Sequence, residues 1–445
     1  MRNDLLGGRS AGLPVRRIGL EQEFFLVDRT GAPCDLADPF LWRCRQAAES
    51  GGLAPHCFKE ECVKSLVEVT TPPSADLAEL TRNYLGSLAL ALEVGAELGL
   101  GLYPSGTYPL PIMPAVREDP GYRMQARTIG RERFLHAGRC AGVHLHLELP
   151  QGTILPDVEV ALDAPAAAQE ELLDLYNLAT ALDPALVALT RACPFYEGRT
   201  GGFAARTVQY RGIPGMPGFD GLYAKLQEVG ALSAYATRVE DLMEQERERY
   251  RAWFAAMDAV GVERRLFAST GSNLNKASWN PVRLNRHGTV EIRSMDSNYP
   301  GLILAVCALV CGAADRVRRE HLRVRPSQEA RTFEVDGDTL LVPCFSYLGD
   351  ELLGAAVSGG VEDPDVEAYL DSIFAFASVH AGTVEAIEPL RCPGGGYKTT
   401  ESEIRQTLSP LATSIGRDKG LRLARESSRG LREEVSLLSR GQPGG

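Results

Sequence analysis

Four short segments of the chain alternate between apolar and polar residues and are rich in β-branched side chains. Alternation with a period of two is typical of a β-strand that buries one face. The segments are Arg17–Val27, Ser65–Thr70, Val143–Leu149 and Val290–Met295. In Thr332–Val342 the pair Asp336-Gly337 separates two apolar runs, and this pattern predicts a β-hairpin.

Longer segments with helical periodicity separate these strands and dominate the last third of the chain. The predicted helices are Ala75–Leu98, Glu170–Leu182, Arg238–Val260, Leu302–His321, Val366–Ala386 and a broken Glu401–Ser439. Stretches rich in glycine and proline predict loops at Tyr103–Pro120, Gly212–Gly221 and Cys392–Gly396. The last loop is either a connector or a flexible segment over a site. Long helical segments between strands favour an α+β fold with an antiparallel sheet covered by helices on one side.

The composition is that of an ordinary globular protein and excludes disordered, collagen-like and coiled-coil classes. Hydrophobic residues make up 44% of the 445 residues, and 58 acidic against 47 basic residues give a net charge of −11. This acidic balance argues against general nucleic-acid binding. We expect a core of strands and helices over residues 1–325 and a mainly helical part over residues 326–445 that packs on it as one unit.

No segment of the sequence predicts export or membrane insertion. Met1–Ser10 is not followed by an apolar run of signal-peptide length. The longest apolar stretch, Gly301–Ala314, is too short to span a bilayer. The ten cysteines are scattered without a CxxC pair, which indicates reduced thiols. These features predict a cytoplasmic protein without a membrane anchor.

Each of the four predicted strands carries ionisable side chains at alternate positions. Residues two apart in a strand point to the same face of the sheet, so Glu21 and Glu23 share a face, as do His144 and His146. The whole set, here called the charged face, consists of Glu21, Glu23, Glu68, His144, His146, Glu148, Glu291 and Arg293. The apolar residues between them would pack on helices behind the sheet.

Such a concentration of carboxylates points to a bound cation. Carboxylates at close range repel one another and raise each other's pKa unless a cation neutralises them. Carboxylate oxygens with a minor imidazole contribution and no thiolate favour Mg²⁺ or Mn²⁺. The alternative is a solvated outer sheet face, on which charged and apolar residues alternate without binding anything.

Six short motifs, in order between Ile18 and about Asp296, give the chain a family resemblance. They are Gly19-Leu20-Glu21-Gln22-Glu23, Glu68 before Thr70-Thr71-Pro72, Gly106-Thr107-Tyr108-Pro109, Gly142-Val143-His144-Leu145-His146, Pro194–Gly201 and His287–Arg293. In these the chain resembles the glutamate–cysteine ligases, and most of all the family-2 carboxylate–amine ligases. Tyr108 stands where the family has a histidine, and the last 120 residues carry no recognised match.

The resemblance implies a glutamine-synthetase-like fold, in which a curved, mainly antiparallel sheet holds Mg²⁺ and ATP on its concave face. It also implies the reaction. ATP phosphorylates the side-chain carboxylate of a small acid, and a small amine then attacks the acyl phosphate to give an amide. Glutamate and cysteine are the family's usual acid and amine, which would place the chain in glutathione biosynthesis. The identity of both substrates and a homo-oligomeric state are left open.

Within this resemblance, phosphoryl transfer between anions needs neutralisation by metal ions and arginines. The expected metal ligands are Glu21, Glu23, Glu68, His144 and Glu291. Three further residues, Glu61, His146 and Glu148, are weaker candidates or orient the ligands. Glu61 is equally compatible with a surface position.

Arg293 is expected to act with Glu291 in catalysis by meeting the γ-phosphate as it transfers. Its alternative role is a structural ion pair with Glu291. The acid substrate would be bound by Arg199, Arg206, Arg211 and Tyr196, since arginine forks match carboxylates.

Two other functions remain open from the sequence. His144-Leu145-His146 imitates the paired-histidine strand of metal-dependent amidohydrolases, although the alternating βα pattern of those barrels is missing. The second alternative is a ligase-derived protein that binds a nucleotide or an amino acid without catalysis. Amine-dependent release of ADP would separate a ligase from such a binding protein.

Overall fold

The protein is described by a computed structural model over residues 15–155, 160–161, 163–201, 204–212, 221–270, 277–379 and 382–441. Met1–Ser10 and most of the predicted loop Gly212–Gly221 lie outside the described residues. Within these residues the strands form one large sheet and two small ones.

The large sheet has seven strands, and every pairing in it is antiparallel. Its order is β2 (Phe58–Glu60), β3 (Leu66–Thr70), β1 (Ile18–Val27), β5 (Gly142–Glu148), β9 (Thr289–Asp296) and β8 (Val282–Asn285), with β4 (Gly101–Tyr103) also paired to β1. The four strands predicted from alternation are confirmed and form its centre. The α+β class with an antiparallel sheet is confirmed as well.

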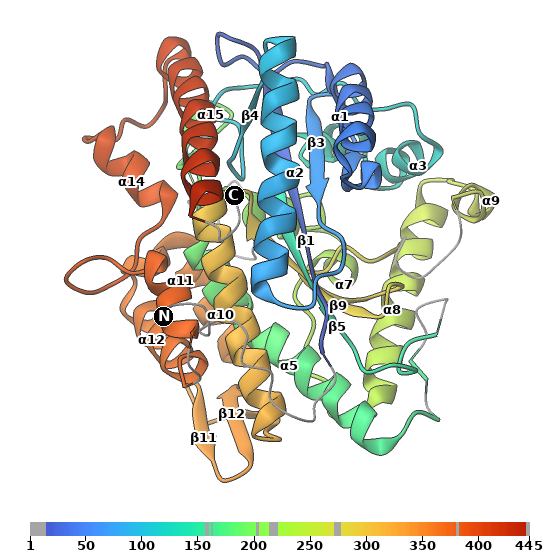
Figure 1. Cartoon of the computed structure of the whole chain (residues 1–445). Coiled ribbons are helices and arrows are strands. Elements are labelled where there is room, and N and C mark those ends of the chain that lie inside the picture. The colour runs from blue at the N-terminus through green and yellow to red at the C-terminus, as the bar shows by residue number, and fades with distance from the viewer. Residues whose placement is uncertain are drawn as a thin grey trace.

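Three long helices cover one face of this sheet, as Figure 1 shows. They are α2 (Leu77–Leu98), α5 (Ala166–Leu189) and α10 (Pro300–Arg319). The alternate apolar residues of the strands pack against them in the main hydrophobic core, with Phe24, Leu145 and Ile292 fully buried. The charged residues between them therefore point to the opposite face.

The opposite face is also covered by helices and short strands. They include α3 (Pro120–Ile129), α4 (Arg131–Phe134), β6 (Phe195–Tyr196), β7 (Arg199–Thr200), α6 (Ala205–Arg211), α7 (Gln227–Gly230), α8 (Val239–Ala259) and α9 (Arg264–Ala268). Helix α1 (Ala37–Gly51) instead packs beside α2 in the main hydrophobic core. A second hydrophobic cluster, with Phe25, Trp253 and Phe267 at its centre, holds many of these pieces together. The charged face is thus an enclosed site and not an open sheet surface.

The last third of the chain is mainly helical, as predicted. β10 (Arg323–Ser327), β11 (Glu334–Asp336) and β12 (Thr339–Pro343) form a small sheet. The predicted hairpin is present between β11 and β12, and Gly337 and Asp338 form its turn. The helices that follow are α11 (Leu353–Ser358), α12 (Pro364–Ala377), α13 (Thr383–Ile387), α14 (Thr400–Thr407) and α15 (Arg417–Arg440). The predicted break in Glu401–Ser439 is confirmed. The prediction of one helix over Val366–Ala386 is wrong, because α12 ends at Ala377 and α13 begins at Thr383. Cys392–Gly396 is flanked by Arg391 and Tyr397, which pack on Phe374 of α12, so this loop is a connector.

The predicted end of another helix is also wrong. The expected end at Leu182 precedes Pro184, yet α5 continues to Leu189 with Pro184 inside it. Every side chain from Leu172 to Leu189 is buried, so tertiary packing holds the helix together past the proline. α5 and α10 are long and apolar enough to cross a membrane, but 100% and 72% of their apolar windows are buried inside the molecule. Both are the core helices of this fold.

Candidate active site on the charged face

Strand register places the ionisable residues of neighbouring strands directly opposite one another. Glu23 of β1 faces Glu68 of β3, and Glu21 of β1 faces His144 of β5. His146 of β5 faces Glu291 of β9. Directly opposed residues on antiparallel strands share a face and have neighbouring side chains, so the register alone assembles a continuous cluster.

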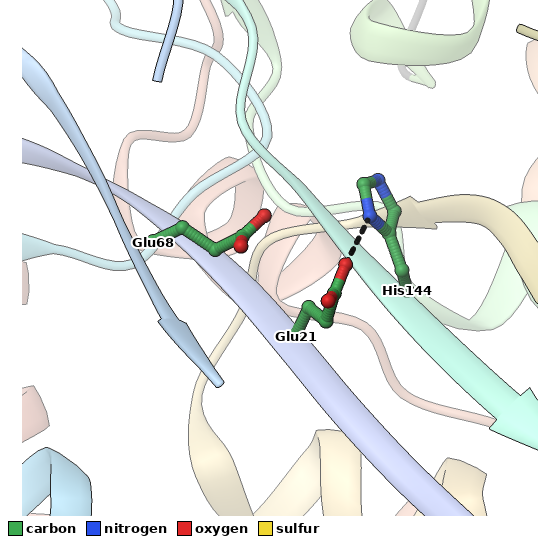
Figure 2. Close-up of side chains that lie close together, drawn as sticks. All are labelled: Glu21, Glu68 and His144. Atoms are coloured by element: carbon green, nitrogen blue, oxygen red, sulfur yellow. Dashed lines mark hydrogen bonds and ion pairs between the residues drawn. The ribbon is translucent and has the colours of Figure 1, made fainter. Parts of the chain in front are cut away.

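Three overlapping groups in this cluster could each hold a metal ion. Within each group the ligand atoms lie within 4.8 Å of one another. The groups are Glu21, Glu68 and His144; Glu21, His146 and Glu291; and Glu23, Glu61 and Glu68. Figure 2 shows the first group, in which the carboxylate of Glu21 approaches Nδ1 of His144 at 3.4 Å. All five predicted metal ligands are thus brought together, and Glu61 and His146 join them.

Two buried imidazole nitrogens in the cluster fit a cation. Nε2 of His144 and Nε2 of His146 are buried and have no hydrogen-bond partner among the described residues. Their nearest carboxylate oxygens, on Glu23 and Glu21 respectively, both lie 3.6 Å away, beyond hydrogen-bond distance. Nδ1 of His146 is occupied by the hydroxyl of Thr289 at 3.0 Å, which leaves Nε2 facing the carboxylates. The oxygen-rich donor set fits Mg²⁺ or Mn²⁺.

The carboxylates differ in their electrostatic surroundings. Burial favours the neutral form of Glu21, but the nearby imidazoles of His144 and His146 and the charge of Lys59 hold its pKa well below the usual value. Burial and the charges of neighbouring glutamates raise the pKa of Glu61 and of Glu68. The cluster therefore contains more carboxylates than its own cations neutralise, which is the condition that a divalent ion relieves.

A lysine that sequence reasoning missed already occupies part of this cluster. Lys59 of β2 lies opposite Glu68, and its Nζ is 2.8 Å from Glu21 and 3.2 Å from Glu68. Its side chain is 44% exposed, so the ammonium reaches the carboxylates from the solvent side of the sheet edge. Only the cross-strand register, invisible in the sequence, brings it there.

Glu291 is the most heavily paired carboxylate of the site. Two nitrogens of Arg283 lie 2.8 and 3.1 Å from it, and Asn285 and Arg293 also donate to it. Despite burial, the charges of Arg283 and Arg293 hold the pKa of Glu291 well below its usual value. The alternative ion pair between Arg293 and Glu291 is thus present, and Arg293 also lies 3.4 Å from Nδ1 of His144, beside the metal-capable cluster.

The residues predicted to bind the acid substrate are not gathered in one place. Arg206 is buried next to Arg293, whose carbonyl oxygen accepts its Nη1–H at 2.9 Å, and both line a small cavity with Tyr210. Both terminal nitrogens of Arg211 lie 2.6 Å from the buried carboxylate of Asp183, so that guanidinium serves the packing of α6 on α5.

Arg199 and Tyr196 lie in the β6–β7 hairpin, away from the Arg206 cavity. Arg199 is exposed and lines a separate recess with Ser414 and Arg417. The hydroxyl of Tyr196 contacts the imidazole of His136. The expectation that Arg199, Arg211 and Tyr196 line one pocket with Arg206 is therefore not met in this structure, because each is engaged or exposed elsewhere.

Three further positions complete the description of the site. Glu148 lies at the end of β5, where its carboxylate accepts the Arg17 backbone N–H at 2.9 Å, outside the metal-capable groups. Tyr108 is buried, and its hydroxyl donates to the carbonyl oxygen of Gly31 at 2.7 Å, which is a structural role. Asp296, missed from the sequence, ends β9 fully inside the protein, and burial raises its pKa to about 7.

Comparison with known proteins shows which family the chain is similar to. The family model for glutamate-cysteine ligase family 2 matches residues 17–336. A protein of Pseudomonas paraeruginosa provisionally named glutamate–cysteine ligase 2 is 29% identical over 191 residues, which are 42% of this chain and 44% of that protein. The glutamate–cysteine ligase of Halobacterium salinarum is 25% identical over 63% of this chain and 64% of its own length. These matches span less than two thirds of either relative.

Two solved structures share the fold over nearly the whole chain. The glutamate–cysteine ligase of Francisella tularensis, solved in complex with AMP, has a TM-score of 0.51 at 14% identity and is aligned over 96% of this chain and 92% of its own. The bifunctional glutathione synthetase of Pasteurella multocida has a TM-score of 0.51 at 15% identity over 94% of this chain and 52% of its own. The similarity extends through the C-terminal part that the family model does not cover.

Proposed function

The chain belongs to glutamate–cysteine ligase family 2, and we propose that it is an ATP- and Mg²⁺-dependent carboxylate–amine ligase that joins glutamate to cysteine or to a related amine. The observation that carries this proposal is the enclosed cluster of carboxylates and histidines flanked by Arg293 and Arg206. A hydrolytic site needs no such pair of arginines, and the amidohydrolase alternative expects parallel barrel strands, whereas the main sheet described here is antiparallel.

The residues that would hold the metal are Glu21, Glu23, Glu68, His144 and Glu291, with Glu61 and His146 beside them. Mg²⁺ or Mn²⁺ bound there would neutralise the phosphates of ATP and hold them in place for transfer. In the absence of such an ion the ammonium of Lys59 balances part of the charge of Glu21 and Glu68.

Arg293 is the residue that we assign to the transferring phosphoryl group. One of its nitrogens is used by Glu291, and this pairing fixes the guanidinium plane on the charged face next to His144. The remaining N–H groups form a preorganised fork for phosphoryl oxygens, the geometry in which arginine exceeds lysine. Arg206, buried behind it, is the residue we assign to the carboxylates of the acid substrate.

The reaction then has two balanced steps. A side-chain carboxylate oxygen of the acid attacks the γ-phosphorus, the bond to the bridging oxygen of ADP breaks, and an acyl phosphate forms. The amine nitrogen attacks the acyl carbon, phosphate leaves with the former carboxylate oxygen, and the nitrogen loses a proton. Helices α3 and α8 lie on the side of the charged face and would keep water from the acyl phosphate.

An ADP-release screen tests this proposal. The protein is incubated with ATP, Mg²⁺, glutamate labelled with ¹⁸O in its side-chain carboxylate, and a panel of amino acids and amines. We expect ADP release that depends on one amine, with one ¹⁸O transferred to phosphate per amide formed. Glu21→Gln and Glu23→Gln should nearly abolish turnover without unfolding the protein, and excess chelator should do the same.

The outcomes separate the three functions considered. ATP binding without amine-dependent ADP release would assign the chain to non-catalytic nucleotide binding. Formation of the amide with unlabelled phosphate would exclude an acyl-phosphate intermediate. Full activity in excess chelator would exclude a requirement for a metal ion.

A further inference from the structure

A recess with an excess of positive charge lies between α15, the end of β1 and the C-terminal end of α2. Figure 1 shows α15 running alongside α2 and β4. The recess has a volume of about 340 Å³. It is lined by Asp28, Arg29, Arg425, Ser428, Arg429 and Arg432, here called the arginine recess, and by the backbone at 99–101. Asp28 is seven residues beyond Glu21 on an extended strand, so about 20 Å separates the recess from the charged face.

The four arginines are not balanced by acidic groups. Among the described residues, no ion pair within 4.0 Å joins Arg29, Arg425, Arg429 or Arg432 to a carboxylate. Asp28, the one acidic lining residue, instead accepts hydrogen bonds from its own turn, from Thr30 at 2.8 Å and Ala32 at 3.0 Å. Three net positive charges thus share one recess on a chain whose net charge is −11.

The arginines are held together by the backbone that carries them. Arg425, Arg429 and Arg432 follow helical spacing along one face of α15, and like charges at such spacing destabilise a helix. Arg29 joins them because Gly99 lacks a side chain: a Cβ there would lie 3.0 Å from Nε of Arg29. A Cβ on Gly101 would lie 2.2 Å from Oγ of Ser428, so β4 and α15 are in close contact beneath the recess.

We propose that the arginine recess binds a phosphate-bearing small molecule at a site separate from the charged face. Guanidinium forks match phosphate oxygens in pairs, and an anion would remove the repulsion among the four side chains. Arg432 also lines an adjoining hollow of about 590 Å³, in which Leu92 and Val435 form an apolar wall and Glu93 and Arg440 lie at the sides. The ligand is therefore a phosphate ester whose phosphate contacts the arginines and whose apolar portion extends along α2.

Calorimetric titration with inorganic pyrophosphate tests the recess, in EDTA so that metal-dependent binding at the charged face is suppressed. Saturable binding at one site is expected for the full chain. Arg425→Gln combined with Arg429→Gln should weaken it at least about tenfold, since each guanidinium donates charge-assisted hydrogen bonds. The matched control is Arg247→Gln with Arg251→Gln on α8, which removes the same charge from exposed positions. It should leave the affinity within about twofold.

The apolar portion is tested separately by comparing phenyl phosphate with inorganic phosphate. Phenyl phosphate should bind several-fold more tightly, and Val435→Ser should reduce that difference. Equal binding of pyrophosphate by the full chain and by the Arg425/Arg429 double variant would overturn the proposal, as would no saturable binding at millimolar pyrophosphate. Tighter binding of a short DNA duplex than of pyrophosphate would assign the arginines to nucleic acid and overturn it too. None of these results depends on ligase activity.

Discussion

At the scale of single residues, a lysine in place of Arg293 tests whether this side chain acts in catalysis or only pairs with Glu291. Arg293→Lys keeps the charge beside Glu291 but removes the planar fork. We expect kcat to fall by about 100-fold or more, with a smaller change in the KM for ATP, because a preorganised donor to the transition state is lost. Steady-state kinetics and the thermal unfolding temperature of both proteins provide the measurement. Unchanged kcat would mean that the pair with Glu291 is the whole role of Arg293.

Lys59 leads to a second prediction about the metal site. Its ammonium contacts Glu21 and Glu68, which are also proposed metal ligands, so lysine and metal compete for the same oxygens. Lys59→Met should therefore bind Mn²⁺ about tenfold more tightly, since a nearby positive charge is removed. Electron paramagnetic resonance of free Mn²⁺ measures this without activity. Lys64→Met, an exposed lysine five residues away, is the matched control.

The contrary result for Lys59 is equally informative. Weaker Mn²⁺ binding by Lys59→Met would show that the lysine supports the site and does not compete with the metal. Failure of the unaltered protein to bind Mn²⁺ at all would instead remove the proposed metal site.

The residues of the site differ in how far sequence could predict them. Glu21, Glu23 and His144 could be found because alternation in one strand fixes a common face without knowledge of any partner strand. Lys59 and Arg283 could not, because each reaches the cluster only through the register of a neighbouring strand. Arg211 was predicted to bind substrate but pairs with Asp183, 28 positions earlier, and nothing in the sequence indicates that pair.

At the scale of elements, strand length decided what the sequence could predict. β1, β3, β5 and β9 have 5 to 10 residues, enough for a clear alternation. β2 and β4 have three residues and β8 has four, so their pairing is created by tertiary contacts and not by local pattern. The same holds for α5, whose continuation past Pro184 depends on complete burial.

The docking of α15 provides a prediction about one element. Gly31 has a φ of +92°, and a Cβ there would lie 2.2 Å from the carbonyl oxygen of Leu421 in α15. Gly31→Ala should therefore displace the helix and lower the free energy of unfolding by about 3 kcal/mol. Gly152→Ala is the matched control, because Gly152 has a similar φ of +80° but open space around it. It should cost about 1 kcal/mol of backbone strain.

Urea unfolding of both glycine variants gives the two free energies. Limited proteolysis should also release peptides of α15 sooner from Gly31→Ala than from Gly152→Ala. Equal losses of stability would show that α15 adapts to the added methyl group and is not held by the close contact at Gly31.

At the scale of the whole molecule, the C-terminal part is joined to the large sheet through the core. The hydroxyl of Tyr369 in α12 donates to the carbonyl oxygen of Ala181 in α5 at 2.7 Å. Arg191 and Glu401 form an ion pair at 3.1 Å with side chains 2% and 1% exposed. Breaking a buried pair of this kind leaves an uncompensated charge, so the two parts stabilise each other.

We therefore predict that the chain unfolds as one cooperative unit and that a fragment of residues 1–325 does not fold alone. Such a fragment would expose the side of α10 that packs on α12 and α13, and it would leave Arg191 buried without Glu401. Differential scanning calorimetry of the full chain should show a single transition whose calorimetric and van't Hoff enthalpies agree. The fragment should be insoluble or should unfold without a cooperative transition. A second calorimetric transition in the full chain, or a fragment that unfolds cooperatively near the same temperature, would instead define residues 1–325 as an independent domain, and the pair of Arg191 with Glu401 would then be an interface contact between two domains.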